Sequence, residues 1–424
     1  MIDLKWLREH ADLARAGLAA KNVEVPIDRI LELDARVREV RTRVEESAQQ
    51  RNAAAKRIGE ESDADERKQL IERQRAEGGA HDEDRALLKE VERELDELVF
   101  QVPNLPLADV HVGKDESENE VIRKVGDVPV LEFTPKAHWE LGPALNVYET
   151  ERAARISGSR FGYLLHWGAK LEFALVGLAM QELEREGFSL RVPPVLINAE
   201  AMDGMGYTIH GEGNETYYFE QDNQYLVGTS EQSLGAYHMG EVMSREQLPA
   251  RYAGFSTCFR RESGSYGKDT KGIFRVHQFD KVEMFVFTTP EESDAEHERL
   301  LGIEEGLMQK LELPYQVLKM CTGDLGIQAA RKYDLEAWFP SEQRYRELTS
   351  TSTCTDWQAR RLGIRYKLPE GGTAIVHTLN GTAFAISRTI CAILENHQQE
   401  DGSVRIPEAL RPFLGGAEHI TREG

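Results

Sequence analysis

The chain has 424 residues, a formal net charge of −21 at pH 7, and 40% hydrophobic and 29% charged residues. This length is enough for two or three domains with a large buried core, and the composition excludes a disordered tail or a fibre. The acidic balance argues against indiscriminate nucleic-acid binding, since phosphate affinity comes from clustered lysine and arginine, but it leaves room for a local basic surface.

The cysteines and the N-terminal sequence bear on the compartment. Cys258, Cys321, Cys354 and Cys391 lie far apart without paired spacing, which predicts neither a disulfide framework nor a zinc cluster. The start "MIDLKWLREHADLARAG" carries acids among its bases, unlike a secretory signal or a transit peptide, and no apolar run reaches membrane-spanning length. We therefore expect a cytoplasmic protein with no membrane partner.

A helical hairpin is predicted for residues 1–103. The alternating three and four spacing of a coiled-coil seam is followed by Ile30, Leu33, Val37, Val40, Val44, Ala54 and Ile58, with Ser47 and Arg51 as interruptions. After the polar break "IGEESDAD" the register returns with Leu88, Val91, Leu95 and Leu98. Two such helices form an antiparallel coiled coil, whose first helix extends about 45 Å at about 1.5 Å per residue.

Two interpretations of this hairpin are open from its residues. The heptads alone favour an oligomerising coiled coil. The first helix nevertheless carries more bases than acids within an acidic protein, which favours a phosphate-binding arm. These bases are Arg29, Arg36, Arg38, Arg41, Arg43, Arg51, Lys56 and Arg57.

The remaining chain divides into a linker and a larger domain. Prolines in "QVPNLPLADV" end the hairpin, and the polar "HVGKDESENEV" predicts a linker over residues 104–135. Residues 136–424 combine helical segments with aromatic-rich alternating runs near residues 217–227, 253–262, 273–287 and 345–349. This mixture indicates an α+β fold built on an antiparallel β-sheet flanked by helices.

The stretch "CFRRESGSYGKDTKGIFRVHQFDKVEMF" concentrates cations, aromatic rings and carboxylates. Alternate residues share one sheet face if the second run is a strand, and they are Ile273, Arg275, His277, Phe279, Lys281, Glu283 and Phe285. The preceding strand places Arg260 and Glu262 on one of its own faces, and the glycine-containing "SGSYGKDTKG" between them predicts a mobile loop. Arginine binds phosphate through paired hydrogen bonds, aromatic rings stack on nucleobases, and carboxylates bind ammonium groups. The pattern therefore indicates a binding site for ATP and an amino acid. The alternative is a solvated face with cross-strand ion pairs, which the agreement of two strands disfavours.

Three shorter segments carry further candidates. "TAIVHTLNGTAFAISRTICAILENHQ" predicts a strand, a turn at Gly381 and a helix, in which Arg388 is either a buried salt-bridge partner or a second phosphate ligand. In "YRELTSTST", Glu347 and Ser350 offer the oxygen ligands that magnesium accepts beside phosphates, or else form a hydroxyl-rich turn. In "LVGTSEQSLGAYH", Thr229 and Glu231 either bind a small polar ligand or cap the following helix.

Taken together, these strings resemble the seryl-tRNA synthetase family of class II. The resemblance rests on "FRRESGSYGKDTKG", "FRVHQFDKVE", "CTGDLG" and "LNGTAFAISRTICAILEN", and it covers nearly the whole chain, including the hairpin, the "VPNLP" exit and the "GKDE" linker. It implies homodimerisation through residues 158–194, which resemble the first class motif, and tRNA(Ser) binding through the hairpin. It further implies ATP-dependent activation of L-serine to seryl-adenylate and transfer to the 3′ end of tRNA(Ser), with tRNA(Sec) as a further candidate.

The resemblance also implies the site residues. Arg260 and Arg275 would hold the ATP phosphates and the serine carboxylate, and Arg388 would hold the γ-phosphate; these three are the expected catalytic residues. Phe279 would stack on adenine and Glu262 would contact it. The expected ATP site is completed by Arg261, Glu347, Leu348, Thr349 and Ser350, with Glu347 and Ser350 as ligands of Mg²⁺. The expected serine ligands are Thr229, Ser230, Glu231, Glu283 and Thr382.

Two departures from many bacterial members keep other functions open. The serine loop reads "TSEQSLGAYH" rather than a "TAEVPLTN"-like string, and Thr382 stands where serine is common. The alternatives are a diverged paralogue that loads serine or a related amino acid for a biosynthetic or resistance role, and an inactive homologue that retains tRNA binding. A purely structural coiled-coil protein would explain only the first hundred or so residues.

Overall fold

The computed structural model describes residues 1–207, 215–263 and 269–422, apart from the side chains of residues 74–80. The chain divides into two compact units, Met1–Pro103 and Asn104–Gly424. Residues 264–268 of the loop predicted to be mobile, which runs from Ser263 to Gly272, lie outside the described residues. Among the residues described, no helix is both long enough and apolar enough to cross a membrane.

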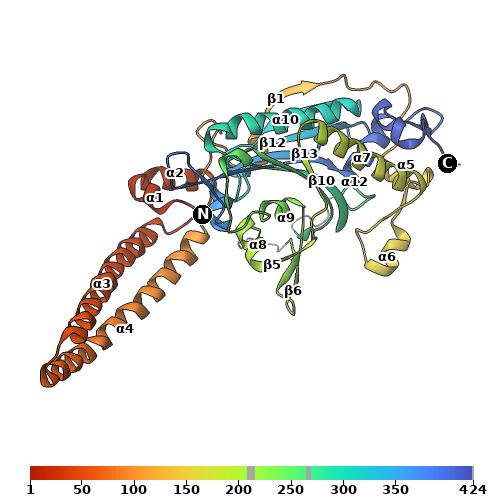
Figure 1. Cartoon of the computed structure of the whole chain (residues 1–424). Coiled ribbons are helices and arrows are strands. Elements are labelled where there is room, and N and C mark those ends of the chain that lie inside the picture. Colours follow the sequence, from red (N-terminus) through yellow and green to blue (C-terminus); the bar gives the residue numbers. More distant parts are fainter. Residues whose placement is uncertain (208–214, 264–268, 423–424) are drawn as a thin grey trace. The chain divides into compact units, whose positions relative to one another are not determined.

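The first unit is the antiparallel helical hairpin that the heptads predict (Figure 1). Its helices are α1 (Leu4–Glu9), α2 (Ala11–Ala20), α3 (Ile27–Glu60) and α4 (Ala64–Phe100). The seam buries Ile30, Val37 and Val40 of α3 and Val91 and Leu95 of α4. The N-cap of α4 is Asp63, whose carboxylate accepts hydrogen bonds from the backbone amides of Asp65 and Glu66 and so starts the returning helix.

A polar layer lies where the sequence interrupts the apolar seam. The Ser47 hydroxyl shares a hydrogen bond of 2.7 Å with Nδ1 of His81, which is buried. Because a polar pair in a coiled coil is satisfied in only one alignment of the helices, this layer helps to set the register of α3 against α4.

The second unit is built on an eight-stranded sheet. Its order is β1 (Glu120–Val125), β11 (Tyr315–Lys319), β12 (Arg331–Phe339), β13 (Arg344–Thr355), β16 (His377–Ala385), β10 (Gln278–Thr288), β9 (Ala250–Phe259) and β4 (Ser189–Arg191). Neighbouring strands are antiparallel except for the parallel pair β4 and β9. Thr, Val, Tyr and Phe are frequent in the central strands, as expected for side chains that pack on a pleated surface.

Helices cover this sheet on one face, and smaller elements lie on the other (Figure 1). The covering helices are α7 (His166–Arg185), α10 (Ser293–Lys310) and α12 (Ile386–Asn396), which bury Leu175, Leu300 and Ile390 in the main core. The opposite face carries α8 (Ala199–Met205), α9 (Glu231–Gly235) and the small sheet of β5 (Leu196–Asn198), β7 (Gln224–Leu226) and β6 (Tyr217–Phe219).

The remaining described elements are short. They are α5 (His138–Ala144), α6 (Glu151–Ser157), α11 (Trp357–Leu362), β2 (Tyr148–Glu149), β3 (Tyr163–Leu164), β8 (Val242–Met243), β14 (Arg365–Lys367), β15 (Thr373–Ile375), β17 (Val404–Arg405), β18 (His419–Ile420) and the 3₁₀ helices η1 (Glu116–Glu118), η2 (Arg245–Gln247), η4 (Pro290–Glu292), η5 (Thr322–Asp324) and η6 (Glu408–Leu414).

The segment predicted as a linker differs from that expectation. Within residues 104–135, β1 pairs with β11 as the edge strand of the main sheet. The amide of Asn104 donates a hydrogen bond of 2.7 Å to the carbonyl of Cys354, which fixes the start of the segment. The polar string that predicted the linker, residues 111–121, contains η1 just before β1, and β1 is largely exposed at the sheet edge.

A second correction concerns Gly381. The sequence predicts a turn at this residue, but Gly381 lies inside β16 and pairs with Met284 and Thr351 of the two neighbouring strands. A Cβ atom here would come within 2.9 Å of Oε1 of Glu304, a buried carboxyl group of α10. The glycine therefore makes room for a side chain from the covering helix instead of reversing the chain.

Candidate active site

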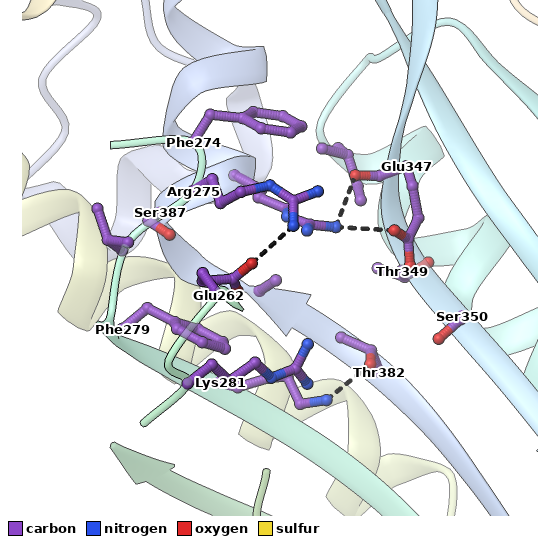
Figure 2. A pocket seen from close by; sticks show the side chains of 15 residues that line it. Glu262, Phe274, Arg275, Phe279, Lys281, Glu347, Thr349, Ser350, Thr382 and Ser387 are labelled. Carbon is purple, nitrogen blue, oxygen red and sulfur yellow. Dashed lines mark hydrogen bonds and ion pairs between the residues drawn. The ribbon is translucent and has the colours of Figure 1, made fainter. Parts of the chain in front are cut away.

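A polar cavity of about 70 Å³ opens where β10, β13 and β16 meet the first turn of α12 (Figure 2). It collects most of the ATP-site residues expected from the sequence. Its lining includes Arg260, Glu262, Arg275, Phe279, Glu347, Leu348, Thr349, Ser350 and Arg388 from that set, the expected serine ligand Thr382, and also Phe274, Val276, Lys281, Ala385 and Ser387.

A bulge in β13 brings the two expected magnesium ligands onto one face. Glu347 pairs with Glu336 of β12 and Ser350 pairs with Asp334, while the register shifts between them. Since Glu336 and Asp334 are two residues apart on one strand, their partners also share a face, and Leu348 is the extra residue. A regular strand would have turned Glu347 and Ser350 to opposite faces.

Arg388 and Glu347 form an ion pair in this cavity. Nη1 of Arg388, in the first turn of α12, donates to Oε2 of Glu347 at 3.0 Å and to its carbonyl oxygen at 3.2 Å. Burial alone would raise the pKa of Glu347, but Arg388 and Lys332 outweigh it and lower the pKa to about 2. The sequence left a salt bridge and a phosphate ligand as alternatives for Arg388, and the structure shows the salt bridge within the candidate phosphate site.

Two arginines enter the cavity from the segment between β9 and β10. Nη1 of Arg275 donates to Oε2 of Glu262 at 2.6 Å. The guanidinium group of Arg260 lies 5.4 Å from the ring centre of Phe279, and its Nε donates to the carbonyl of Gly228 at 3.0 Å. A cation and an aromatic ring thus face the same space, as binding of a nucleotide requires.

The strand expected to begin at Ile273 begins only at Gln278. The alternation predicted from Ile273 is therefore wrong at its start, and Ile273 packs in the hydrophobic core instead of facing the site. Positive φ angles at Asp269 (49°) and Gly272 (71°) turn the chain before it becomes extended. Arg260 and Glu262 likewise follow the end of β9 at Phe259, and Glu262 has a φ of 52°.

The expected serine ligands gather around Glu283 of β10, which is buried. Its Oε2 accepts hydrogen bonds from the hydroxyls of Thr229 at 3.2 Å and Thr382 at 3.3 Å, and Nζ of Lys281 lies 2.5 Å from the same oxygen. Burial raises the pKa of Glu283 to about 7, against the opposing effect of the Lys281 ammonium group. This carboxyl group therefore changes its charge near neutral pH.

Glu231 is held by three donors that the sequence did not identify. Its Oε2 accepts from the Tyr207 hydroxyl at 2.7 Å, and its Oε1 accepts from the amides of Gln358 at 3.2 Å and Asn380 at 3.1 Å. Burial raises the pKa of this carboxyl group as well. A carboxylate offers about four acceptor positions, so the network fixes Glu231 while leaving capacity for one more donor.

Two expected site residues point elsewhere. Nε of Arg261 donates to the carbonyl of Thr216 at 2.9 Å, and its guanidinium group lies 4.8 Å from the ring centre of Tyr217 of β6, outside the cavity lining. The Ser230 hydroxyl donates to the carbonyl of Gly254 of β9 at 3.1 Å. Both side chains therefore hold backbone around the site.

Lys281 is the main cavity residue that the site assignment missed. It lies two residues from both Phe279 and Glu283 on β10, and the alternation placed it on their face, but no role was assigned to it. Tyr207, Gln358 and Asn380 reach the site from α8's C-terminal end, α11 and β16, and their roles depend on long-range packing that no local pattern reveals.

Two family descriptions match the chain. The tRNA synthetase class II core domain (G, H, P, S and T) matches residues 217–397, and the seryl-tRNA synthetase N-terminal domain matches residues 1–106. The serine--tRNA ligase of Thermobifida fusca is 48% identical to this chain over 416 residues, covering 98% of each protein.

Solved structures give the same result. A seryl-tRNA synthetase from Pyrococcus horikoshii, complexed with ATP, is similar with a TM-score of 0.93 and 39% identity, covering 99% of both chains. The cytoplasmic serine-tRNA ligase of Naegleria fowleri, in complex with AMP, has a TM-score of 0.87 and 32% identity, covering 98% of this chain and 96% of that one.

Proposed function

The chain belongs to the seryl-tRNA synthetase family of class II, and we propose from this membership how its residues divide the reaction. It is a serine--tRNA ligase, which activates L-serine with ATP and transfers the seryl group to tRNA(Ser). The identity to serine--tRNA ligases over the full chain gives no support to the paralogue alternative. The observation that carries the proposal is the convergence of Arg260, Arg275 and Arg388 on one cavity that Glu262 and Glu347 also line.

In the first step, a carboxylate oxygen of serine attacks the α-phosphorus of ATP in line, and pyrophosphate leaves as the phosphoanhydride bond breaks. Arg260 and Arg275 would bind the serine carboxylate and the phosphates, and Arg388 would bind the γ-phosphate, which their place in the lining of one cavity supports. Phe279 offers its ring to adenine, and Glu262 is available for a polar contact with it. No enzyme nucleophile takes part, so the rate enhancement comes from alignment and from fixed positive charge.

The serine pocket is proposed to lie at Thr229, Glu231, Glu283 and Thr382. Ionised Glu283 and Glu231 would accept hydrogen bonds from the ammonium and hydroxyl groups of serine. The hydroxyls of Thr229 and Thr382, which already donate to Glu283, fix its orientation. An amino acid without a hydroxyl group leaves a polar pocket unsatisfied, whereas threonine adds a methyl group that the walls must exclude.

Glu347 and Ser350 fit a magnesium ion that is bound together with ATP. They are a carboxylate that stays ionised and a hydroxyl group on one face of β13, which are hard oxygen ligands. Among the described residues, no cluster of three or more His, Cys, Asp or Glu side chains could hold a metal. A two-ligand site suits Mg²⁺, which usually completes its shell with phosphate oxygens and water. When bound, the ion would neutralise negative charge on the phosphates.

In the second step, the terminal ribose hydroxyl of tRNA attacks the carbonyl carbon of seryl-adenylate, and AMP leaves. We assign residues 1–103 as the arm that binds tRNA(Ser) and residues 136–424 as the catalytic domain. The proposed homodimer uses the region of residues 158–194. This is supported by two large apolar side chains that are exposed in the single chain, Phe173 of α7 (69% exposed) and Val192 (83% exposed). The cytoplasmic location and the use of tRNA(Sec) remain predictions.

Pyrophosphate exchange measured with each of the standard amino acids tests this function. We expect exchange with serine and much weaker exchange with alanine, glycine and threonine, followed by charging of tRNA(Ser) in the presence of tRNA. Exchange that prefers another amino acid would support the diverged paralogue, and the absence of any exchange would support an inactive tRNA-binding homologue.

A further inference from the structure

The segment that carries Arg275 has no regular secondary structure to hold it in place. Residues 269–277 precede β10, and they turn at Asp269 and Gly272. An arginine that must meet a phosphate needs a fixed backbone, because a displacement of about 1 Å can cost a hundredfold in rate. Backbone hydrogen bonds fix the end of this segment, where the amide of His277 donates to the carbonyl of Arg160 and its carbonyl accepts from the amide of Arg260. The residues before His277 therefore depend on side-chain contacts for their positioning.

Arg346 of β13 makes two of these contacts. Its Nη2 donates to Oδ1 of Asp269 at 2.6 Å, and its guanidinium carbon lies 3.9 Å from the ring centre of Phe274. The other carboxylate oxygen of Asp269 accepts from Nε of Arg275 at 3.4 Å. A chain of contacts thus runs from β13 through Asp269 to Arg275, and a second holds Phe274, the residue next to Arg275.

The contacts of Arg346 are largely shielded from water. The side chains of Arg346 and Asp269 are 10% and 17% exposed. Burial would raise the pKa of Asp269, but Arg346 and Arg275 outweigh it and hold the pKa below its usual value, so the carboxylate stays charged. Nη1 of Arg346 donates to Oε1 of Glu342 at 2.6 Å, so both terminal nitrogens of the Arg346 guanidinium group donate to carboxylates. Arg346 does not line the cavity, which separates it from the phosphate-binding arginines.

We propose that Arg346 is a positioning residue for adenylate formation, which holds Asp269 and Phe274 so that Arg275 meets the ATP phosphates. Arg346 does not touch the substrate in this assignment; it acts through the segment of residues 269–277. The inference rests on the proposed role of Arg275 in ATP binding.

The test is serine-dependent pyrophosphate exchange by the full-length protein, with KM measured separately for ATP and serine. Arg346→Met and Asp269→Asn should each lower kcat/KM for ATP by about tenfold, with little change in KM for serine. The double variant should be no worse than Arg346→Met alone, because Asp269 positions Arg275 only while Arg346 holds it. Arg346→Lys should recover part of the loss, since lysine keeps the charge but lacks the planar fork.

Arg344→Met is the matched control. Arg344 lies two residues away on β13 and also pairs with Glu342, but it contacts neither Asp269 nor Phe274 through a hydrogen bond, ion pair or ring contact among the described residues. It should keep a normal kcat/KM for ATP. Arg275→Met tests the premise separately, because a normal kcat/KM for ATP in this variant would contradict the proposed role of Arg275 itself.

Three results would overturn the positioning role while leaving that of Arg275 intact. The first is an unchanged kcat/KM for ATP in Arg346→Met when Arg275→Met is impaired. The second is a lower KM for ATP in Asp269→Asn, which would show that the carboxylate of Asp269 competes with phosphate for Arg275. The third is additive loss in the double variant, which would indicate that Arg346 and Asp269 act independently.

Discussion

Arg388 and Glu347 neutralise each other across the candidate site through an ion pair of 3.0 Å between the start of α12 and β13. Each is also proposed to bind a part of the ATP complex, Arg388 the γ-phosphate and Glu347 the magnesium ion. Binding of ATP with Mg²⁺ would therefore replace the Arg388–Glu347 ion pair with two contacts, one between Arg388 and the γ-phosphate and one between Glu347 and the magnesium ion. Both residues would then contribute to substrate recognition.

Arg388→Ala should reduce serine-dependent pyrophosphate exchange by about a hundredfold, the scale of roughly 3 kcal/mol found when a fixed charge donor is removed. The fold should be retained, as judged by an unchanged melting temperature. Arg405→Ala is the matched control, because Arg405 pairs with Glu312 at 2.8 Å and lies outside the cavity. Near-normal exchange by Arg388→Ala would rule out its assignment as a phosphate ligand.

Glu347→Gln should raise the magnesium concentration that gives half-maximal exchange by about tenfold, since the amide keeps the size of the side chain but loses its charge. Titration of MgCl₂ at fixed ATP measures this. Glu336→Gln provides the comparison: Glu336 is the cross-strand neighbour of Glu347, but it accepts a hydrogen bond from Gln316 and does not line the cavity. Equal magnesium requirements in the two variants would contradict the metal assignment.

The sequence predicts the elements better than it predicts how the site residues meet. The hairpin follows from its heptads because burial of Ile30, Val37 and Leu95 is a local, periodic property. The shared face of Glu347 and Ser350 depends on the extra residue Leu348 in β13, and a bulge leaves no reliable mark in a single sequence.

The position of Arg275 shows the same limit. Its residue type suggested a phosphate ligand, but the strand assumed to carry it starts three residues later, at Gln278. The chain turns at Asp269 and Gly272, just before the predicted alternation, and becomes a regular strand only at Gln278. Contacts of Arg346 help to hold the irregular segment between these points. Such contacts join residues 77 positions apart, beyond the range of any local pattern.

Serine binding should depend on pH through Glu283, whose pKa is raised to about 7. An ammonium group is bound by the ionised form, so KM for serine at saturating magnesium and ATP should rise as the pH falls below 7. In Glu283→Gln, KM should be higher and this inflection should disappear. The same inflection in the variant would show that another group, such as Glu231, controls binding.

The same pKa predicts how stability changes with pH. Glu283 binds its proton more tightly in the folded chain than in the unfolded chain, where the pKa is about 4.3. Between these values the folded state holds more protons, so this group lowers the free energy of unfolding as the pH rises from about 4.3 to 7, by at most about 1.4 kcal/mol per unit. Urea unfolding across this range should show a weaker decline in Glu283→Gln than in the wild-type chain.

The last prediction concerns the hairpin and which of its bases are available to tRNA. From the open end of the hairpin to its middle, bases of α3 pair with acids of α4: Arg29 with Glu94, Arg41 with Glu92 and Arg43 with Asp84. Arg57, Arg67 and Lys68, close to the turn between the helices, are exposed and make no ion pair within the part of the chain that the structure describes. These three are free to exchange counterions for phosphates.

Deleting residues 1–103 should leave serine-dependent exchange nearly intact and abolish tRNA charging at ordinary concentrations, because the chemistry lies in the second unit. In the full-length chain, replacing Arg57, Arg67 and Lys68 with glutamine should weaken tRNA binding and reduce its salt dependence by roughly one unit of slope for each phosphate that the arm no longer neutralises. The matched triple replacement of Arg29, Arg41 and Arg43 should change that slope much less, since their charges are already compensated. Unaltered charging by the truncated protein would instead identify the hairpin as an oligomerising coiled coil.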